Sequence, residues 1–252
     1  MLPEGTHVAL TGGAGGIGGL VAKELLAAGA RLTIVDRVEG VSFPATYIKG
    51  DLSTAGGMCE IGEALAGDEC DVLINLAGIQ HFGPFENQAP GHIQATYMID
   101  LVAPAILSQA VLSGMKHRGR GHIVNIGSVF GAINFAHFVT YSSAKAGLQG
   151  FSEALRREVA GTGIDVTYIA PRAVKTPLNG TDVLRFADLT KMNMDEPEDV
   201  AKRIVRAISK REKEVYIGFP ENLFVRVNAL MPRVVDAALA KDDRKTRALF
   251  NS

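Results

Sequence analysis

Short apolar runs alternate with longer stretches of helical spacing along most of this chain. The longest helical stretches cover residues 93–116, 140–160 and 197–210. A strict alternation of strands and helices is typical of a parallel sheet covered by helices on both faces. The sequence therefore predicts an α/β fold of the Rossmann type, a doubly wound parallel sheet of about seven strands that binds ligands at the carboxyl ends of its strands. The predicted strands are residues 8–10, 31–35, 46–48, 71–75, 123–126, 166–169 and 215–217.

Apolar positions continue beyond the last predicted strand. We expect residues 219–252 to form a C-terminal helical extension, which Pro232 breaks into two short helices at an angle. Three roles are open for its apolar stripe: packing on its own domain, joining a subunit interface, or lying on a membrane surface. The mixed charges on its polar side favour the first two roles. The stripe consists of Leu223, Phe224, Val227, Leu230, Met231, Val234, Val235 and Ala238.

Composition limits the classes of protein to consider. With 252 residues, of which 47% are hydrophobic, the chain can bury one large core, and we expect residues 1–252 to form a single domain. The 26 Lys and Arg are balanced by 27 acids, which gives no electrostatic case for a nucleic-acid partner. The two Cys lie outside any CxxC arrangement, and the six His show no metal-ligand spacing, so no metal is expected.

The expected location is cytoplasmic. The N-terminus shows no signal-peptide pattern, and no apolar run reaches the roughly 18 residues of a membrane span. Expected partners are therefore small molecules and other copies of the chain.

A glycine-rich turn links the first predicted strand to the first helix. It reads TGGAGGIG over residues 11–18, with Gly12, Gly16 and Gly18 at its key positions. Glycines allow such a turn to be tight and to approach a pyrophosphate, which then lies at the positive end of the helix. A flexible loop is the alternative, but the strand before the turn and the helix after it argue against that interpretation.

The second predicted strand ends at Asp36, about 20 residues beyond the glycine turn. A carboxylate here can accept hydrogen bonds from the ribose hydroxyls of an adenosine and repels a 2′-phosphate. The neighbouring Arg37 could partly accommodate that phosphate, but the glycine turn contains no Lys or Arg. The sequence therefore favours NAD over NADP as cofactor.

Candidate catalytic residues lie in the middle of the chain. Tyr141 and Lys145 are four residues apart on a predicted helix, so the ammonium can act on the phenol and lower its pKa from about 10 toward neutrality. Ser128 follows a buried strand and could point at a substrate oxygen. Surface pairs with the Tyr–Lys spacing are common, so the trio gains its meaning from the glycine turn. Together they suit proton transfer to or from an alcohol or carbonyl.

In these motifs the chain resembles the short-chain dehydrogenase/reductase family over residues 6–218. Asp51 and Leu52 match the position of the acidic residue that contacts the adenine, and residues 75–78 match the NNAG element. Ser128, Tyr141 and Lys145 match the catalytic set. The residues that match the cofactor motifs are Thr11, Gly12, Gly16, Ile17, Gly18, Asn75, Ala77 and Gly78.

The resemblance implies an NAD(P)-dependent oxidoreductase that interconverts an alcohol and a ketone or aldehyde, acting as a homodimer or homotetramer. Ser128 would polarise the substrate oxygen, Tyr141 would be the acid or base, and Lys145 would also hold the nicotinamide ribose. Pro171, Val174 and Thr176 would lie near the carboxamide and phosphates. Residues 177–194 would cover the substrate, in a pocket that Phe130 and Phe138 help to make mostly apolar.

The chain departs from the family pattern at two positions. Asp100 occupies the place of an Asn whose helix-kinking main chain holds a water, and its charge near Lys145 could shift the working pH. Arg172 stands where the family usually has a Gly beside the nicotinamide. It could reach a substrate anion or the cofactor phosphates, but we expect it to point to solvent.

Two other functions are consistent with parts of the pattern. A nicotinamide-dependent epimerase or dehydratase of the same superfamily usually carries GxxGxxG, which differs from the turn found here. A regulatory protein that senses dinucleotide without turnover typically lacks the Tyr or the Lys. This chain has both.

Overall fold

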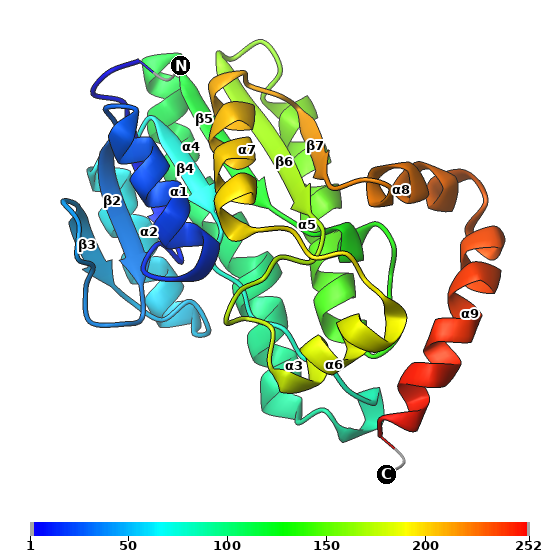
Figure 1. The fold of residues 1–252 in the computed structure, drawn as a ribbon. Helices are drawn as coiled ribbons and strands as arrows, with labels where there is room; N and C mark the ends of the chain where they lie inside the picture. Colours follow the sequence, from blue (N-terminus) through cyan, green and yellow to red (C-terminus); the bar gives the residue numbers. More distant parts are fainter. Residues whose placement is uncertain (1–2, 251–252) are drawn as a thin grey trace.

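The computed structural model describes residues 3–250, and its centre is a seven-stranded parallel sheet (Figure 1). The strand order is β3-β2-β1-β4-β5-β6-β7. Successive strands are added on one side of β1 up to β3 and on its other side from β4 onward, so the order of addition reverses between β1 and β4. The predicted doubly wound α/β fold is therefore confirmed, and the reversal places a crevice at the carboxyl ends of the central strands. The strands are β1 His7–Thr11, β2 Arg31–Asp36, β3 Thr46–Lys49, β4 Val72–Asn75, β5 Gly121–Ile126, β6 Ile164–Pro171 and β7 Glu214–Ile217.

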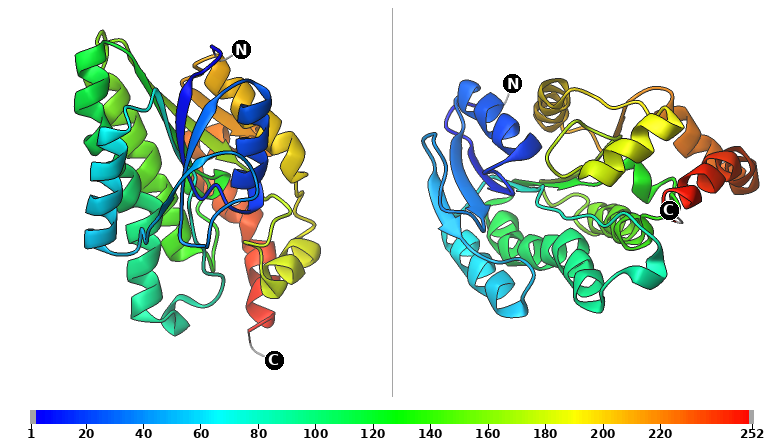
Figure 2. Two further views of the ribbon diagram at one scale, coloured as in Figure 1. Left: turned by 90° about the vertical axis from the view of Figure 1, so that its left-hand side faces the viewer. Right: turned by 60° about the horizontal axis from the view of Figure 1, so that its bottom comes forward.

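Helices cover both faces of the sheet (Figure 2). Successive side chains of a strand point to opposite faces, so Val8 and Leu10 pack with α1 and α7, whereas Ala9 packs with α2 and α4. Burial on both faces explains why the central strands read as continuous apolar runs. The helices are α1 Gly16–Ala27, α2 Ala55–Gly67, α3 Pro90–Tyr97, α4 Ala103–Arg118, α5 Val139–Glu158, α6 Thr181–Thr190, α7 Pro197–Ser209, α8 Glu221–Leu230 and α9 Pro232–Ala248.

The single helix predicted over residues 93–116 is divided in the structure. A π-helical turn, Met98–Val102, separates α3 from α4. Pro104 lies at the start of α4 and has no backbone N–H to donate to the preceding turn, which accounts for the change of pitch. Asp100 lies in this π turn and is fully buried.

The helical stretch Pro90–Arg118 is long and apolar enough to cross a membrane by length and composition alone. The sequence analysis predicted a helix over residues 93–116 but expected no apolar run long enough for a span. Its side chains Leu107, Val111 and Met115 are buried in the core between the sheet and α2. A core helix of a soluble protein meets the same criterion, so the stretch is weak support for a span.

The C-terminal extension forms the two predicted helices, and Pro232 is the first residue of the second one. α8 leaves the β7 edge of the sheet, and α9 runs back to α6 at the carboxyl ends of the strands (Figure 1). Several apolar side chains remain exposed on α8 and at the start of α9. An oligomer would cover them, and the predicted homodimer or homotetramer stays a prediction. The exposed side chains are Leu223, Phe224, Leu230, Met231 and Val234.

Candidate active site

A cavity of about 1380 Å³ lies at the carboxyl ends of the strands. It extends from the glycine turn and the end of β2, past the end of β4, to α5 and α6. The structure thus gathers on one wall most of the residues that the sequence analysis singled out. These are Gly12, Gly16, Ile17, Asp36, Arg37, Asp51, Leu52, Ala77, Gly78, Ser128, Tyr141, Lys145, Pro171, Val174 and Thr176.

The glycine turn has the shape that a phosphate group requires. Gly12 has φ +71°, and a Cβ there would lie 2.8 Å from the backbone of Ala77. Gly15 and Gly16 border open space, and no side chain caps the first turn of α1. The first N–H groups of a helix have no partner within it, and this helix start lines the cavity, where its N–H groups could bind the pyrophosphate of a dinucleotide.

Gly18 does not lie on the cavity wall. A Cβ at this position would come within 2.0 Å of the carbonyl oxygen of Gly12. The glycine lets α1 pack directly on the turn, so its contribution to a cofactor site is the shape of the turn rather than a direct contact.

The Asp36 carboxylate is held in place by two backbone groups. Its Oδ2 accepts a hydrogen bond from the N–H of Ala14 at 3.0 Å, and its Oδ1 accepts one from the N–H of Arg37 at 2.7 Å. The first bond ties the end of β2 to the glycine turn. A ribose bound beside the turn would therefore meet a carboxylate in a fixed position.

Asp51 and Leu52 form the wall beyond β3. Hydrogen bonds from Ser53 hold the pKa of the Asp51 carboxyl below its usual range, so the group is a charged acceptor at neutral pH. Leu52 is buried beside it and offers an apolar surface. The pair combines a hydrogen-bond acceptor with a surface suited to a flat ring.

Asn75 lies behind the cavity wall, which differs from the direct cofactor contact expected from the sequence. Its Nδ2 donates to Asn125 Oδ1 at 2.8 Å, and Asn125 Nδ2 donates to Ser152 Oγ at 2.8 Å. Ser152 in turn donates to the carbonyl of Leu148. This buried chain links β4 and β5 to α5, the helix that carries Tyr141 and Lys145, so Asn75 acts on their position.

Tyr141, Lys145 and Ser128 meet between α5 and the end of β5. The Lys145 ammonium lies 5.7 Å from the centre of the Tyr141 ring and donates to the carbonyl of Ile126 at 3.1 Å. Ser128 caps the short 3-10 helix Val129–Gly131, and its Oγ accepts a hydrogen bond from the N–H of Phe130. All three side chains of the trio are buried on the cavity wall.

Burial raises the pKa of Tyr141 above its usual value. The Lys145 ammonium and a hydrogen bond with Ser128 act in the opposite direction, whereas Asp100 adds to the increase. The lowering by Lys145 agrees with the expectation from spacing, but burial outweighs it. The phenol therefore holds its proton at neutral pH in this structure.

Asp100 acts through Lys145 rather than from the cavity wall. Its Oδ1 accepts a hydrogen bond from the N–H of Ile79 at 2.9 Å, and its Oδ2 lies 3.6 Å from Lys145 Nζ. Burial raises the pKa of Asp100, and the ammonium opposes that increase. The helix changes pitch at this position in the π turn, and the carboxyl group of Asp100 lies beside Lys145.

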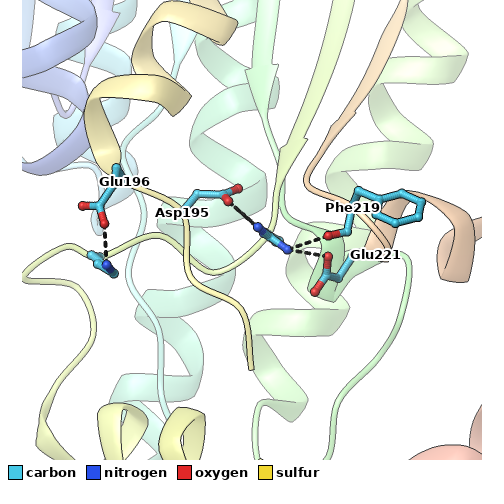
Figure 3. Close-up of polar contacts among 6 residues, drawn as sticks. Asp195, Glu196, Phe219 and Glu221 are labelled. Carbon is cyan, nitrogen blue, oxygen red and sulfur yellow. Dashed lines mark hydrogen bonds and ion pairs between the residues drawn. The ribbon is translucent and has the colours of Figure 1, made fainter. Parts of the chain in front are cut away.

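Arg172 does not point to solvent, so that expectation from the sequence is wrong. Its Nε and Nη2 donate to Asp195 Oδ1 at 2.9 and 2.5 Å, and its Nη1 donates to Glu221 Oε2 at 2.8 Å and to the carbonyl of Phe219 at 2.9 Å. In Figure 3, Asp195 lies on one side of the shared guanidinium, and Phe219 and Glu221 lie on the other. No spacing rule links Arg172 to these partners, because the guanidinium and its partners come from three separate segments.

Residues 177–194 form one side of the cavity. Phe186 of α6 packs with Phe130, Phe138 and Tyr141, and Val183 and Met192 border the same cluster. A β-bridge between Val174 and Asp195 joins the chain just before this segment to the chain just after it. The sequence around Gln80 also indicated a place in this pocket, and Gln80 lies on the wall; the sequence analysis missed His92, Ala95 and Ile99 there, because no motif marks them.

Comparisons with known proteins agree with this geometry. The family described as short chain dehydrogenase matches residues 6–184. The chain is 30% identical to the ketoacyl reductase HetN of Nostoc sp. over 85% of this chain and 79% of that protein. It is 31% identical to dehydrogenase/reductase SDR family member 7B of Bos taurus, over 95% and 82% of the two chains.

A solved structure gives the same result. A putative NAD(P)-dependent gluconate 5-dehydrogenase from Beutenbergia cavernae, with NADP bound at low occupancy, superposes with a TM-score of 0.76 and 28% identity. The match covers 85% of this chain and 95% of that one. The protein is therefore an oxidoreductase with a nucleotide-binding Rossmann fold, and the chain belongs to the short-chain dehydrogenase family.

Proposed function

We propose that this protein interconverts an alcohol and a ketone or aldehyde, with Tyr141 as the acid or base. The observation that carries the proposal is the position of Ser128, Tyr141 and Lys145 on the same cavity wall as the glycine turn and Asp36. A nicotinamide cofactor supplies or accepts the hydride when it is bound. The protein supplies binding, orientation and the proton.

The cofactor is assigned to residues whose geometry fits a dinucleotide. The glycine turn and the start of α1 would hold the pyrophosphate, Asp36 the adenosine ribose, and Asp51 with Leu52 the adenine. Lys145 would hold the nicotinamide ribose. The nicotinamide half of the cofactor would contact five wall residues near Tyr141 and Lys145, namely Ala77, Gly78, Pro171, Val174 and Thr176.

The proton chemistry follows from the environment of Tyr141. Because burial raises its pKa, the phenol carries its proton at neutral pH and can donate it to a carbonyl oxygen that gains a hydride. Ser128 Oγ would donate a hydrogen bond to the same oxygen and so polarise the carbonyl. The ammonium of Lys145 would stabilise the phenolate that forms, and Asp100 with the Ile126 carbonyl keeps that ammonium in place.

Turnover is expected when the protein is mixed with NADH or NADPH and a panel of ketones and aldehydes, measured as loss of absorbance of the reduced cofactor. The reverse reaction is expected with the matching alcohols and oxidised cofactor. Cofactor binding without turnover of any panel member in either direction would instead support the dinucleotide-sensing alternative. A change of configuration without net oxidation would support the epimerase alternative.

We propose NAD as the preferred cofactor, because two backbone N–H groups fix the Asp36 carboxylate beside the glycine turn, and a carboxylate at the end of the second strand repels a 2′-phosphate. Asp36→Ser is expected to raise the ratio of kcat/KM for NADP over NAD by about 10- to 100-fold, since removing one charge repulsion in a partly exposed site is worth about 1–3 kcal/mol. Arg37 remains to meet the phosphate.

The matched control is Glu60→Ser on α2, which removes an exposed carboxylate away from the cavity wall. The cofactor ratio should not change in this control. An Asp36→Ser protein with the same ratio as the unaltered protein would show that Asp36 does not select the cofactor.

A further inference from the structure

The half of the cavity toward α5 and α6 is here called the substrate half. The Lys and Arg side chains on its wall already have partners within the protein. Among the described wall residues, Arg37 and Lys49 lie at the ends of β2 and β3, on the side assigned to the adenosine. Lys145 and Arg172 lie on the other side, and both are almost fully engaged by the protein. Recognition of an anionic substrate group requires a cation or a set of free donors, so the partners of these two residues bear on the charge that the site accepts. His92, another basic side chain on the wall, hydrogen-bonds through Nδ1 with Gln88 and Thr96.

Arg172 cannot serve a substrate anion. Its Nε, Nη1 and Nη2 all donate hydrogen bonds to Asp195, Glu221 and the Phe219 carbonyl, with donor to acceptor distances of 2.5–2.9 Å. One guanidinium faces two carboxylates, so the cluster that Figure 3 shows has a formal charge of −1. A carboxylate or phosphate on the substrate would be repelled here rather than bound.

The Lys145 ammonium is likewise bound by groups of the protein. Its Nζ donates to the Ile126 carbonyl and lies 3.6 Å from the buried Asp100 carboxylate. Both side chains are at most 4% exposed. Oxygen atoms of Ile126 and Asp100 therefore hold the ammonium in place, and its assigned work is on Tyr141 and the nicotinamide ribose.

Polar side chains around the substrate half also bond to one another. Gln80 Nε2 donates to the carbonyl of Leu178 at 2.9 Å and to Asn179 Oδ1 at 3.0 Å, and Asn179 Nδ2 donates to the Val174 carbonyl. These bonds fasten the start of the 177–194 segment to the loop after β4. The amide groups thus hold the cavity wall together.

Apolar side chains form the rest of this half. Next to them, and including Phe138 of the wall, is an aromatic cluster in which the Phe82 ring contacts Phe138, Phe186 and Phe250 with ring centres 4.8, 5.1 and 5.3 Å apart. Phe250 follows α9, so the C-terminal extension supports the outer side of the cluster. The wall residues that would face the substrate are Phe130, Phe138, Val183, Ala187, Met192 and Met194.

We propose that the substrate is an uncharged alcohol or carbonyl compound with a bulky apolar group, aromatic or branched alkyl, which lies between α5 and α6. This inference rests on the proposed function for the position of the reacting oxygen at Ser128 and Tyr141. An apolar group gains free energy from burial against this wall, whereas an anionic group would lose its hydration and meet no unpaired Lys or Arg among the described residues of this half. The site would thus select substrates with an uncharged, apolar group over substrates with an anionic group.

The test uses two pairs of ketones that differ only in a carboxylate: acetophenone with 4-acetylbenzoate, and cyclohexanone with 4-oxocyclohexanecarboxylate. Binding to the protein saturated with oxidised cofactor, with which a ketone does not react, is measured by ligand-observed NMR titration, and turnover is measured separately with reduced cofactor. The neutral member of each pair should bind at least about 10-fold more tightly. Equal or tighter binding of the carboxylates, or no binding of the neutral members, would overturn the inference.

The separate turnover measurement distinguishes the two proposals. Preferential binding of the neutral ketones without any reduction would contradict the proposed reaction but not the proposed substrate chemistry. Reduction of the carboxylates in preference to the neutral ketones would support the reaction and overturn the substrate chemistry.

A pair of variants on α6 tests the same point within the protein. Val183→Lys places a cation on the wall, and the preference for the neutral ketones should fall by about 10-fold or reverse. Leu184→Lys places the same charge on the adjacent exposed position, which does not line the cavity, and the preference should be unchanged. The same shift in both variants, or no shift in either, would contradict the assignment of this wall to the substrate.

Discussion

Tyr141→Phe is expected to lower kcat by about 100- to 10,000-fold, the range typical for loss of a positioned acid or base. The change removes only the hydroxyl, because the ring stays packed against Phe130 and Phe138 in the aromatic cluster. NADH affinity should therefore remain nearly unchanged. Steady-state kinetics and a fluorescence titration with NADH measure the two quantities independently.

Tyr97→Phe is the matched control. The Tyr97 hydroxyl bonds to Ser143 Oγ outside the cavity wall, so its loss should leave kcat unchanged. Most of the activity surviving in Tyr141→Phe would exclude the phenol as the proton donor.

In the unaltered protein, the rate of carbonyl reduction should be flat near neutral pH and fall as the pH rises through the Tyr141 pKa, since only the protonated phenol can donate.

Arg172→Met is expected to lower the free energy of unfolding by about 2 kcal/mol, and the melting temperature by about 4–8 °C. The substitution leaves the carboxylates of Asp195 and Glu221 together without a counter-charge, and both are only about one-fifth exposed. The partial exposure keeps the expected loss below that of a fully buried pair. Chemical denaturation followed by circular dichroism measures the loss.

Two comparisons isolate the cause. Adding Asp195→Asn and Glu221→Gln to Arg172→Met should restore part of the lost stability, because no unpaired carboxylate then remains. Arg185→Met breaks an exposed ion pair with Asp182 on α6 and should hardly change stability. An Arg172→Met protein as stable as Arg185→Met would show that the cluster does not hold the two segments.

The sequence was sufficient for features that depend on neighbouring residues. The glycine turn and Asp36 are connected by a single strand–helix–strand unit, and that unit largely determines their relative position. The spacing of Tyr141 and Lys145 on one helix determines that they share a face. Pro232 starts α9 for the local reason that it lacks an N–H. Alternating apolar runs predicted the seven parallel strands, because burial on both faces marks a strand in sequence.

Only the tertiary structure decided features that join distant segments. Arg172, Asp195 and Glu221 come from the end of β6, the segment before α7 and the start of α8, and no local pattern brings them together. The contact of Phe250 with Phe82 likewise depends on the course of α9.

The upward shift of the Tyr141 pKa belongs to the same class. Spacing along a helix predicts which charge acts on the phenol, but the larger effect is burial. The extent of burial is set by how β5, α5 and α6 pack around the ring, and that packing is a property of the folded chain as a whole.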